Sequence, residues 1–163
     1  MTPLTFNVIK VFGLASIASI IAILWCPLLT NFLYRYKLWK KTARQKAISG
    51  EPAVVFNSLH KEKEVGTPRM GGLLIWMTTL LVVFLFFVLS LIFPDTWLAQ
   101  FNFLSRGQTW LPLFTLVTAS ILGLVDDILQ VAGKGKYIGG GLSLKKRLFI
   151  IILIGLIGSI WFY

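Results

Sequence analysis

The sequence predicts an all-α, polytopic membrane protein, and two observations carry that prediction. Hydrophobic residues make up 56% of the 163 residues and charged residues only 13%, whereas a typical soluble domain has about a quarter of its residues charged. The apolar residues also gather into four long uncharged runs, and a helix needs about 20 such residues to cross the hydrocarbon core. A water-soluble globule and a disordered chain are excluded. A disulfide framework is excluded because Cys26 is the only cysteine.

Four expected transmembrane spans form one membrane domain over residues 1–163. They cover about residues 11–29, 71–93, 109–125 and 148–163. The first span has no small-x-small cleavage site, so we interpret it as an uncleaved anchor and not as a signal peptide. The fourth span is still apolar at Tyr163. We therefore expect the chain to be the N-terminal part of a larger helical bundle.

Lysine and arginine are concentrated in two loops. Of the 16 basic residues, nine fall in residues 31–70 and five in residues 126–147, with one each in the 94–108 loop and the N-terminal tail. The positive-inside rule places the two basic loops in the cytoplasm and residues 94–108 outside. Anionic membrane lipids are sufficient partners for these cations. No nucleic-acid-reading motif accompanies the net charge of +10, so we expect no nucleic-acid partner.

An acid pair, Asp126 and Asp127, directly follows the third expected span in LGLVDDILQ. Carboxylates are disfavoured at the negative end of a helix dipole, and acids at a membrane edge are candidates for function. Mg²⁺, which prefers one or two carboxylates together with substrate phosphates, would stabilise them there. If the helix continues through the pair, the two side chains point about 100° apart, so one can hold metal while the other takes a proton. The alternative is a solvated pair that marks the membrane boundary.

A second constellation, HKEKEVGTPRMGG, precedes the second span. We expect Thr67 to be the N-cap and Pro68 the first helical residue, which would present free N–H groups to an anion. Two glycines follow and allow close approach of a ligand or of a neighbouring helix. The candidate residues here are the glycines Gly71 and Gly72 and the cations Lys63 and Arg69.

A third segment, GKGKYIGGG at residues 133–141, is glycine-rich and basic. It matches neither the P-loop nor the dinucleotide-binding pattern. We interpret it as a flexible loop that brings Lys134 and Lys136 to a phosphate. Together, the three segments predict a site for phosphoryl transfer between a water-soluble phosphate ester and a lipid phosphate at one membrane face.

The segments HKEKEVGTPRMGG, GLVDDILQ and GLSLKKR, in this order, resemble the polyprenyl-phosphate N-acetylhexosamine-1-phosphate transferases. The closest resemblance is to the muramoyl-pentapeptide branch. It implies that undecaprenyl phosphate attacks UDP-N-acetylmuramoyl-pentapeptide with the help of Mg²⁺, and that UMP leaves. It also implies a site on the inner face of the bacterial cytoplasmic membrane and a role in peptidoglycan synthesis. Because the family has a further metal-binding aspartate and a histidine-rich loop in later helices, we expect this chain alone to be inactive.

Carried over by position, the resemblance makes Asp126 and Asp127 the catalytic pair. Asp126 is the candidate either for accepting a proton from the lipid phosphate or for orienting it, and Asp127 is the candidate that supports the metal and the substrate phosphates. The candidate substrate- or phosphate-binding residues are Lys63, Thr67, Pro68, Arg69, Gly71, Gly72, Lys134, Lys136 and Arg147. The chain departs from the family pattern where Arg69 replaces a threonine and where Gln130 and Arg147 replace lysines.

Alternatives stay open. Thr67-Pro68-Arg69 is closer to the N-acetylglucosamine-1-phosphate branch, which would make UDP-N-acetylglucosamine or a related UDP-sugar the donor. From another class, the chain is a non-catalytic membrane subunit or a small transporter whose acids line an ion path. A second copy of the chain, forming a homodimer, is a further candidate partner.

Overall fold

The computed structural model of the protein describes residues 3–41, 65–134 and 140–163. These residues form four α-helices and two short 3-10 helices, and no β-strand beyond an isolated bridge occurs among them. The all-α prediction is confirmed. The elements are α1 (Pro3–Arg35), α3 (Gly72–Ile92), η1 (Trp97–Phe101), η2 (Gly107–Thr109), α4 (Trp110–Val131) and α5 (Leu144–Phe162).

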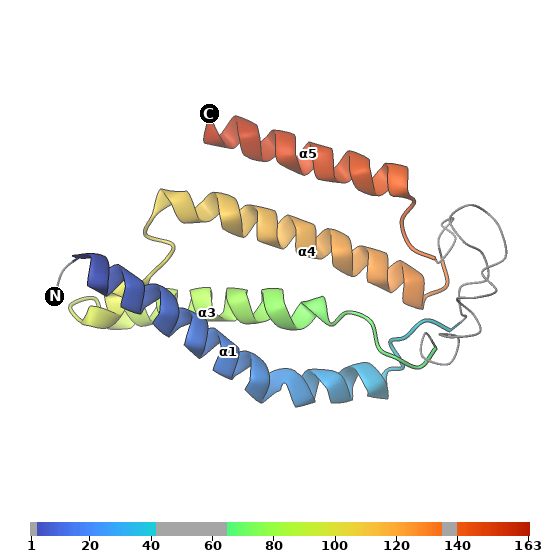
Figure 1. Ribbon diagram of the computed structural model, residues 1–163, viewed down its shortest axis with the longest axis horizontal. Coiled ribbons are helices and arrows are strands. Elements are labelled where there is room, and N and C mark those ends of the chain that lie inside the picture. Colours follow the sequence, from blue (N-terminus) through green and yellow to red (C-terminus); the bar gives the residue numbers. More distant parts are fainter. Residues whose placement is uncertain (1–2, 42–64, 135–139) are drawn as a thin grey trace.

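The helices lie alongside one another in chain order (Figure 1), with α1 packed on α3, α3 on α4 and α4 on α5. One end of the bundle holds the C-terminal ends of α1 and α4 and the N-terminal ends of α3 and α5. We call it the acid-pair end, because Asp126 and Asp127 lie in the last turns of α4. The opposite end, the far end, holds η1, η2, the start of α1 and the last residues of α5.

Within the described part of the chain, three helical segments are long and apolar enough to cross a membrane: Thr5–Arg35, Gly72–Ile92 and Gly107–Val131. They correspond to the first three predicted spans and extend beyond the limits predicted for the first and third. The helix α5 forms where the fourth span is predicted but is not one of the three segments. Its first turn carries three charged residues, Lys145, Lys146 and Arg147.

A small hydrophobic core joins α1, α3 and η1. Its buried members are Leu14, Val82, Phe86 and Phe101. The rings of Phe86 and Phe101 stack with their centroids 5.5 Å apart. Lys10 of α1 donates from Nζ to the backbone carbonyl of Gln100 and lies 6.0 Å from the centre of the Phe101 ring. These contacts fix α1 against α3 and η1 on the side of the bundle away from the acid pair.

An interhelical hydrogen bond supports the same pairing nearer the acid-pair end. Trp25 of α1 donates from Nε1 to Thr78 Oγ1 of α3 at 2.8 Å, and Thr78 Oγ1 donates to the Leu74 carbonyl at 2.6 Å. Polar bonds of this kind hold membrane helices together, each contributing about 0.6 kcal/mol. The start of α3, where part of the candidate site lies, is therefore anchored to α1.

The start of α3 differs from the prediction that Thr67 is its N-cap and Pro68 its first helical residue. The helix begins at Gly72, with Gly71 as its N-cap. Pro68 instead forms an antiparallel bridge with Trp39, and the Arg69 N–H donates to the Leu38 carbonyl at 3.0 Å. Met70 then has a φ of 72°, which no right-handed helix accommodates. The predicted cap is wrong because pairing with a distant segment holds these residues extended.

Candidate functional site

The acid pair lies inside a helix, because α4 continues through it to Val131. Adjacent helical side chains point about 100° apart, and the two carboxylates accordingly face different neighbours. Asp126 accepts hydrogen bonds from Leu142, which lies just before α5, and from Arg147 in the first turn of that helix. Asp127 accepts a hydrogen bond from the backbone N–H of Met70, in the segment that leads into α3. The α4 end therefore connects to the starts of both neighbouring helices.

Asp126 is the more enclosed member of the pair, with 8% of its surface exposed. Its Oδ1 accepts a hydrogen bond from the Leu142 N–H at 2.8 Å. Its Oδ2 accepts from Gln130 Nε2 at 2.8 Å and from Arg147 Nη2 at 2.6 Å. Hydrogen bonds between charged partners are about twice as strong as neutral ones. Three donors therefore hold the Asp126 carboxylate in one orientation.

The approach of the 140–142 segment to Asp126 requires a glycine at position 141. Gly141 has a φ of 90°, and a Cβ there would lie 2.6 Å from Asp126 Oδ1 and 2.9 Å from Gln130 Cγ. A side chain at this position would both strain the backbone and clash with α4. This end of the segment predicted to be a flexible loop is therefore packed against α4, whereas residues 135–139, including Lys136, lie outside the described residues.

Asp127 faces a cavity between α3 and α4. Its Oδ2 accepts a hydrogen bond from the Met70 backbone N–H at 3.2 Å. The cavity has a volume of about 260 Å³, and Met70, Gly72 and Gly123 line it together with Asp127. The sequence predicts an anion site at the start of α3, and in this structure Asp127 accepts a hydrogen bond from Met70, two residues before that helix begins. The acid pair and the 67–72 segment, predicted to act together, are in direct contact.

The two glycines at the start of α3 stand beside open space. A Cβ built on Gly71 or Gly72 would meet no atom within 4 Å. Of the two explanations for these glycines, close packing of a neighbouring helix therefore has no support among the described residues. Gly72 lines the Asp127 cavity, which agrees with the other explanation, the approach of a ligand.

Gln130 joins the two halves of the site. Arg69 donates from Nη1 to Gln130 Oε1 at 2.5 Å, and Gln130 Nε2 donates to Asp126. With Arg147 on the other side of Asp126, four side chains form one polar chain, which we call the bridge network: Arg69, Gln130, Asp126 and Arg147. The spacing of Asp126 and Gln130, four residues apart on one helix, is the sequence signal that could have indicated their contact.

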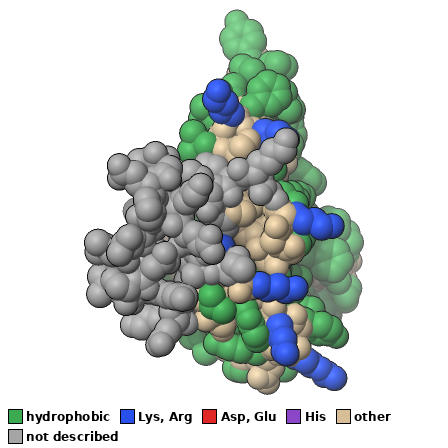
Figure 2. Space-filling view, turned by 90° about the vertical axis from the view of Figure 1, so that its right-hand side faces the viewer, with side chains coloured by type: hydrophobic (Ala, Val, Ile, Leu, Met, Phe, Trp, Pro, Cys, Tyr) green, Lys and Arg blue, Asp and Glu red, His purple; other side chains and the backbone are tan. Residues whose placement is uncertain are grey.

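The other predicted phosphate-binding residues are less closely grouped. Thr67 is exposed, and Pro68 is engaged in the bridge with Trp39. Lys134 is exposed just after α4, and Lys63 lies outside the described residues. Figure 2 views the bundle from the acid-pair end and shows Lys and Arg side chains spread across this face. The structure therefore brings Arg69 and Arg147 to the acid pair and places Lys134 on the surface nearby.

A metal ion at this end would depend chiefly on Asp127. The described part of the chain contains no group of three His, Cys, Asp or Glu side chains that could hold a metal. Asp126 is engaged by three donors, whereas Asp127 lines the cavity. Mg²⁺ is commonly bound through one or two carboxylates plus substrate phosphates. Asp127 fits that ligand pattern when a phosphate shares the site.

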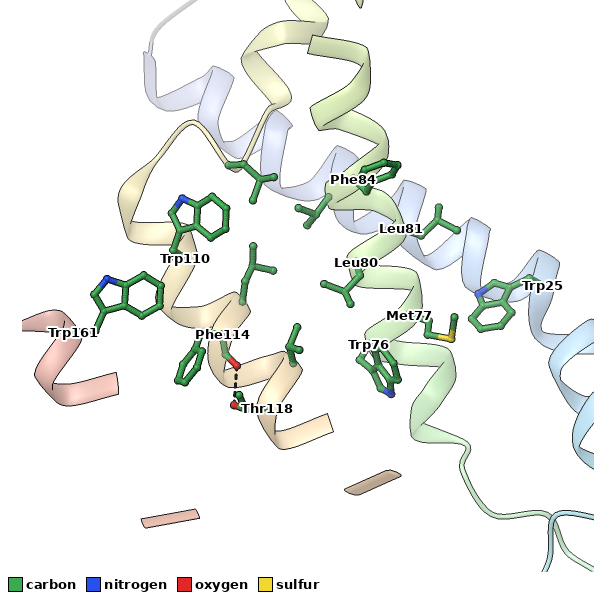
Figure 3. Close-up of a pocket in the computed structure, with 14 residues that line it drawn as sticks. Trp25, Trp76, Met77, Leu80, Leu81, Phe84, Trp110, Phe114, Thr118 and Trp161 are labelled. Atoms are coloured by element: carbon green, nitrogen blue, oxygen red, sulfur yellow. Dashed lines mark hydrogen bonds between the residues drawn. The ribbon is translucent and has the colours of Figure 1, made fainter. Parts of the chain in front are cut away.

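A larger, apolar cavity of about 930 Å³ lies between α3 and α4. Figure 3 shows Leu80 and Phe84 of α3 and Phe114 of α4 around it. Trp76 lines both this cavity and the Asp127 cavity. The polar site and the apolar cavity therefore adjoin at Trp76.

These features define a class of protein: a multi-pass membrane protein with a carboxylate site, flanked by arginines, at one end of its apolar helices. Comparison with curated proteins gives the particular relatives. The chain is 30% identical over 141 residues to the phospho-N-acetylmuramoyl-pentapeptide-transferase of Oceanobacillus iheyensis, a match that covers 86% of this chain and 36% of that protein. It is 30% identical over 149 residues to the enzyme of the same name from Anoxybacillus flavithermus, covering 91% of this chain and 38% of that protein.

A third relative of the same name, from Streptococcus pneumoniae, is 33% identical over 114 residues, covering 70% of this chain and 30% of that protein. The resemblance inferred from the motifs is thus confirmed: the chain is a homologue of the phospho-N-acetylmuramoyl-pentapeptide transferases. It spans well under half the length of these relatives. No family model matches the chain, and no solved structure matches it.

Proposed function

We propose that the enzyme containing this chain transfers phospho-N-acetylmuramoyl-pentapeptide from its UDP-linked donor to undecaprenyl phosphate, releasing UMP and forming lipid I. The single observation that carries the proposal is the placement of Asp127 in a cavity beside the start of α3, in a homologue of enzymes of that name. We further propose that this end faces the cytoplasm, where the soluble donor is available, because the basic loops belong to it.

In this proposal Asp127 meets the substrate phosphates, with Mg²⁺ as the shared cation. The metal, when bound, neutralises charge on the phosphate oxygens. Arg69 directly precedes Met70, which donates to Asp127, and Arg147 donates to the neighbouring Asp126. Guanidinium groups bind phosphate through paired hydrogen bonds. The apolar cavity that shares Trp76 with the site supports a substrate with a hydrocarbon tail.

In the proposal Asp126 neither accepts a proton from the lipid phosphate nor orients it, which are the two roles that the resemblance implies. Its two oxygens already accept three hydrogen bonds, so we assign it the orientation of Gln130, Arg147 and the 140–142 segment. A phosphate monoester has its second pKa near 6, so most of the lipid phosphate is already a dianion at neutral pH. The attack therefore needs positioning and charge neutralisation more than it needs a base.

The test is UMP release by the full-length protein with two donors supplied separately. We expect release from UDP-N-acetylmuramoyl-pentapeptide and its loss in Asp127→Asn, with Asp95→Asn, an exposed acid in the loop before η1, as the matched control. Release only from UDP-N-acetylglucosamine would favour the other branch, which Thr67-Pro68-Arg69 suggests. Undiminished lipid-linked product in Asp127→Asn would contradict the catalytic proposal and favour a non-catalytic membrane protein.

A further inference from the structure

Gln130 connects a cation to an anion, and its side chain is suited to that task. Its Oε1 accepts a hydrogen bond from Arg69 Nη1 at 2.5 Å, while its Nε2 donates to Asp126 Oδ2 at 2.8 Å. A primary amide carries an acceptor and two donors in one rigid plane. A carboxylate in its place could accept from Arg69 but would repel Asp126, and an ammonium group would do the reverse. The two partners therefore fix which way the amide points.

The amide is also held by packing. A Cβ at Gly140 would lie 3.4 Å from Gln130 Cα, and one at Gly141 would lie 3.2 Å from Gln130 Nε2. The segment that leads into α5 thus runs directly against Gln130, and it leaves no room for a side chain at Gly141, whereas a Cβ at Gly140 would make an ordinary van der Waals contact. Gln130 is half-buried as a result, and its orientation depends on both neighbouring segments.

The bond to Arg69 reaches the part of the chain that borders the Asp127 cavity. Arg69 is 61 residues from Gln130 in sequence, and the next residue, Met70, lines the cavity and donates to Asp127. The position of the Arg69 guanidinium relative to the cavity is therefore set in part by Gln130.

We propose that Gln130 is a positioning residue, which holds Arg69, the neighbour of the cavity-lining Met70, so that its guanidinium meets a phosphate of the UDP-linked donor. This inference rests on the proposed function. Gln130 itself does not touch the substrate in this account. Its effect passes through Arg69, and it should therefore appear in donor binding and depend on the presence of Arg69.

The test is a double-mutant cycle in the full-length protein, measured as steady-state UMP release. Gln130→Met keeps the length of the side chain and removes both hydrogen bonds, and Arg69→Ala removes the cation. We expect each to raise KM for the UDP-linked donor by about tenfold with kcat within about twofold, and the double variant to be no worse than Arg69→Ala alone. Gln108→Met, an exposed glutamine at the far end, is the matched control.

Gln130→Glu separates the two bonds, because it can still accept from Arg69 but cannot donate to Asp126. We expect its KM for the donor to stay within about threefold of the wild type, since Arg69 is still held. Additive effects in the cycle, or a KM for Gln130→Glu as high as for Gln130→Met, would overturn the inference. A thermal melt of each variant identifies losses due to folding alone. Failure of the wild-type protein to release UMP from either donor would contradict the proposed function instead.

Discussion

The Met70 backbone N–H donates a hydrogen bond to Asp127 Oδ2 at 3.2 Å, across 57 residues of sequence. The residue that donates it, Met70, adopts a φ of 72°, a left-handed conformation that costs a residue other than glycine about 1–2 kcal/mol. Strained residues of this kind often occur at functional sites. The bond joins the acid pair to the start of α3 and gives one wall of the cavity its shape.

Asp127→Asn should separate activity from folding. The asparagine carbonyl can still accept the Met70 N–H, so we expect the melting temperature to change little. The charge that would attract cation and phosphate is lost, so UMP release should fall by about 100-fold or more. Asp127→Ala, which removes the acceptor as well, should lower the melting temperature in addition. Equal melting temperatures for Asp127→Ala and wild type would show that the Met70 bond contributes nothing to stability.

Asp126→Ala should destabilise the acid-pair end. It leaves Leu142 N–H, Gln130 Nε2 and Arg147 Nη2 without their shared acceptor, at a cost of about 1–3 kcal/mol. Arg147→Lys keeps the charge but not the planar guanidinium, and because the Arg147 side chain is 42% exposed we expect a loss well under that of Asp126→Ala. Thermal unfolding in detergent measures both. A larger loss for Arg147→Lys would contradict this account, because Asp126→Ala removes the ion pair together with the other two bonds.

Gly141→Ala should strongly destabilise the fold, although it adds only one methyl group. The new methyl group would meet Asp126 Oδ1 at 2.6 Å, and the residue would be held at a φ of 90°. We expect a loss of about 1–3 kcal/mol, measured as a lower melting temperature. Gly13→Ala is the matched control, because a Cβ there meets nothing within 4 Å and alanine favours the helix by about 1 kcal/mol. A neutral Gly141→Ala would show that the 140–142 segment can move away from α4.

Gly72→Ala should have opposite effects on stability and on binding. A Cβ at this position meets nothing within 4 Å, so alanine should stabilise the first turn of α3 by up to about 1 kcal/mol. It also projects a methyl group at the edge of the Asp127 cavity, so we expect KM for a substrate to rise several-fold with kcat less affected. Gly155→Ala in α5, also open to space, should give the stability change without the change in KM.

The fold class and the order of the helices could be predicted from the sequence because long uncharged apolar runs have few alternatives to membrane helices. The separation of the two carboxylates could be predicted because it follows from helical periodicity alone. Thr67 and Pro68 have the chemistry of a helix start, yet they pair with the 38–39 segment instead. That pairing joins residues about 30 positions apart in the chain, and no local sequence pattern predicts it.

The roles of Gln130 and Gly141 were not predictable for the same reason. Glutamine near the end of a helix is ordinary, and its contact with Arg69 exists only because α3 and α4 pack side by side. Gly141 is one of several glycines in its segment, and only the position of Asp126 distinguishes it. The residues of the candidate site could be predicted from motifs, whereas the hydrogen bonds that connect them required the tertiary structure.

The unbroken course of α4 through the acid pair has a mechanical consequence. Both carboxylates belong to one continuous helix. A shift of α4 along its axis by the rise of a single residue, about 1.5 Å, would therefore disturb the bonds to Met70 and to Arg147 at the same time. Neither the contact of Asp127 with Met70 nor that of Asp126 with Arg147 could change without the other. An axial shift of α4 would therefore affect the starts of α3 and α5 together, and the Asp127 cavity would form or be lost as one unit.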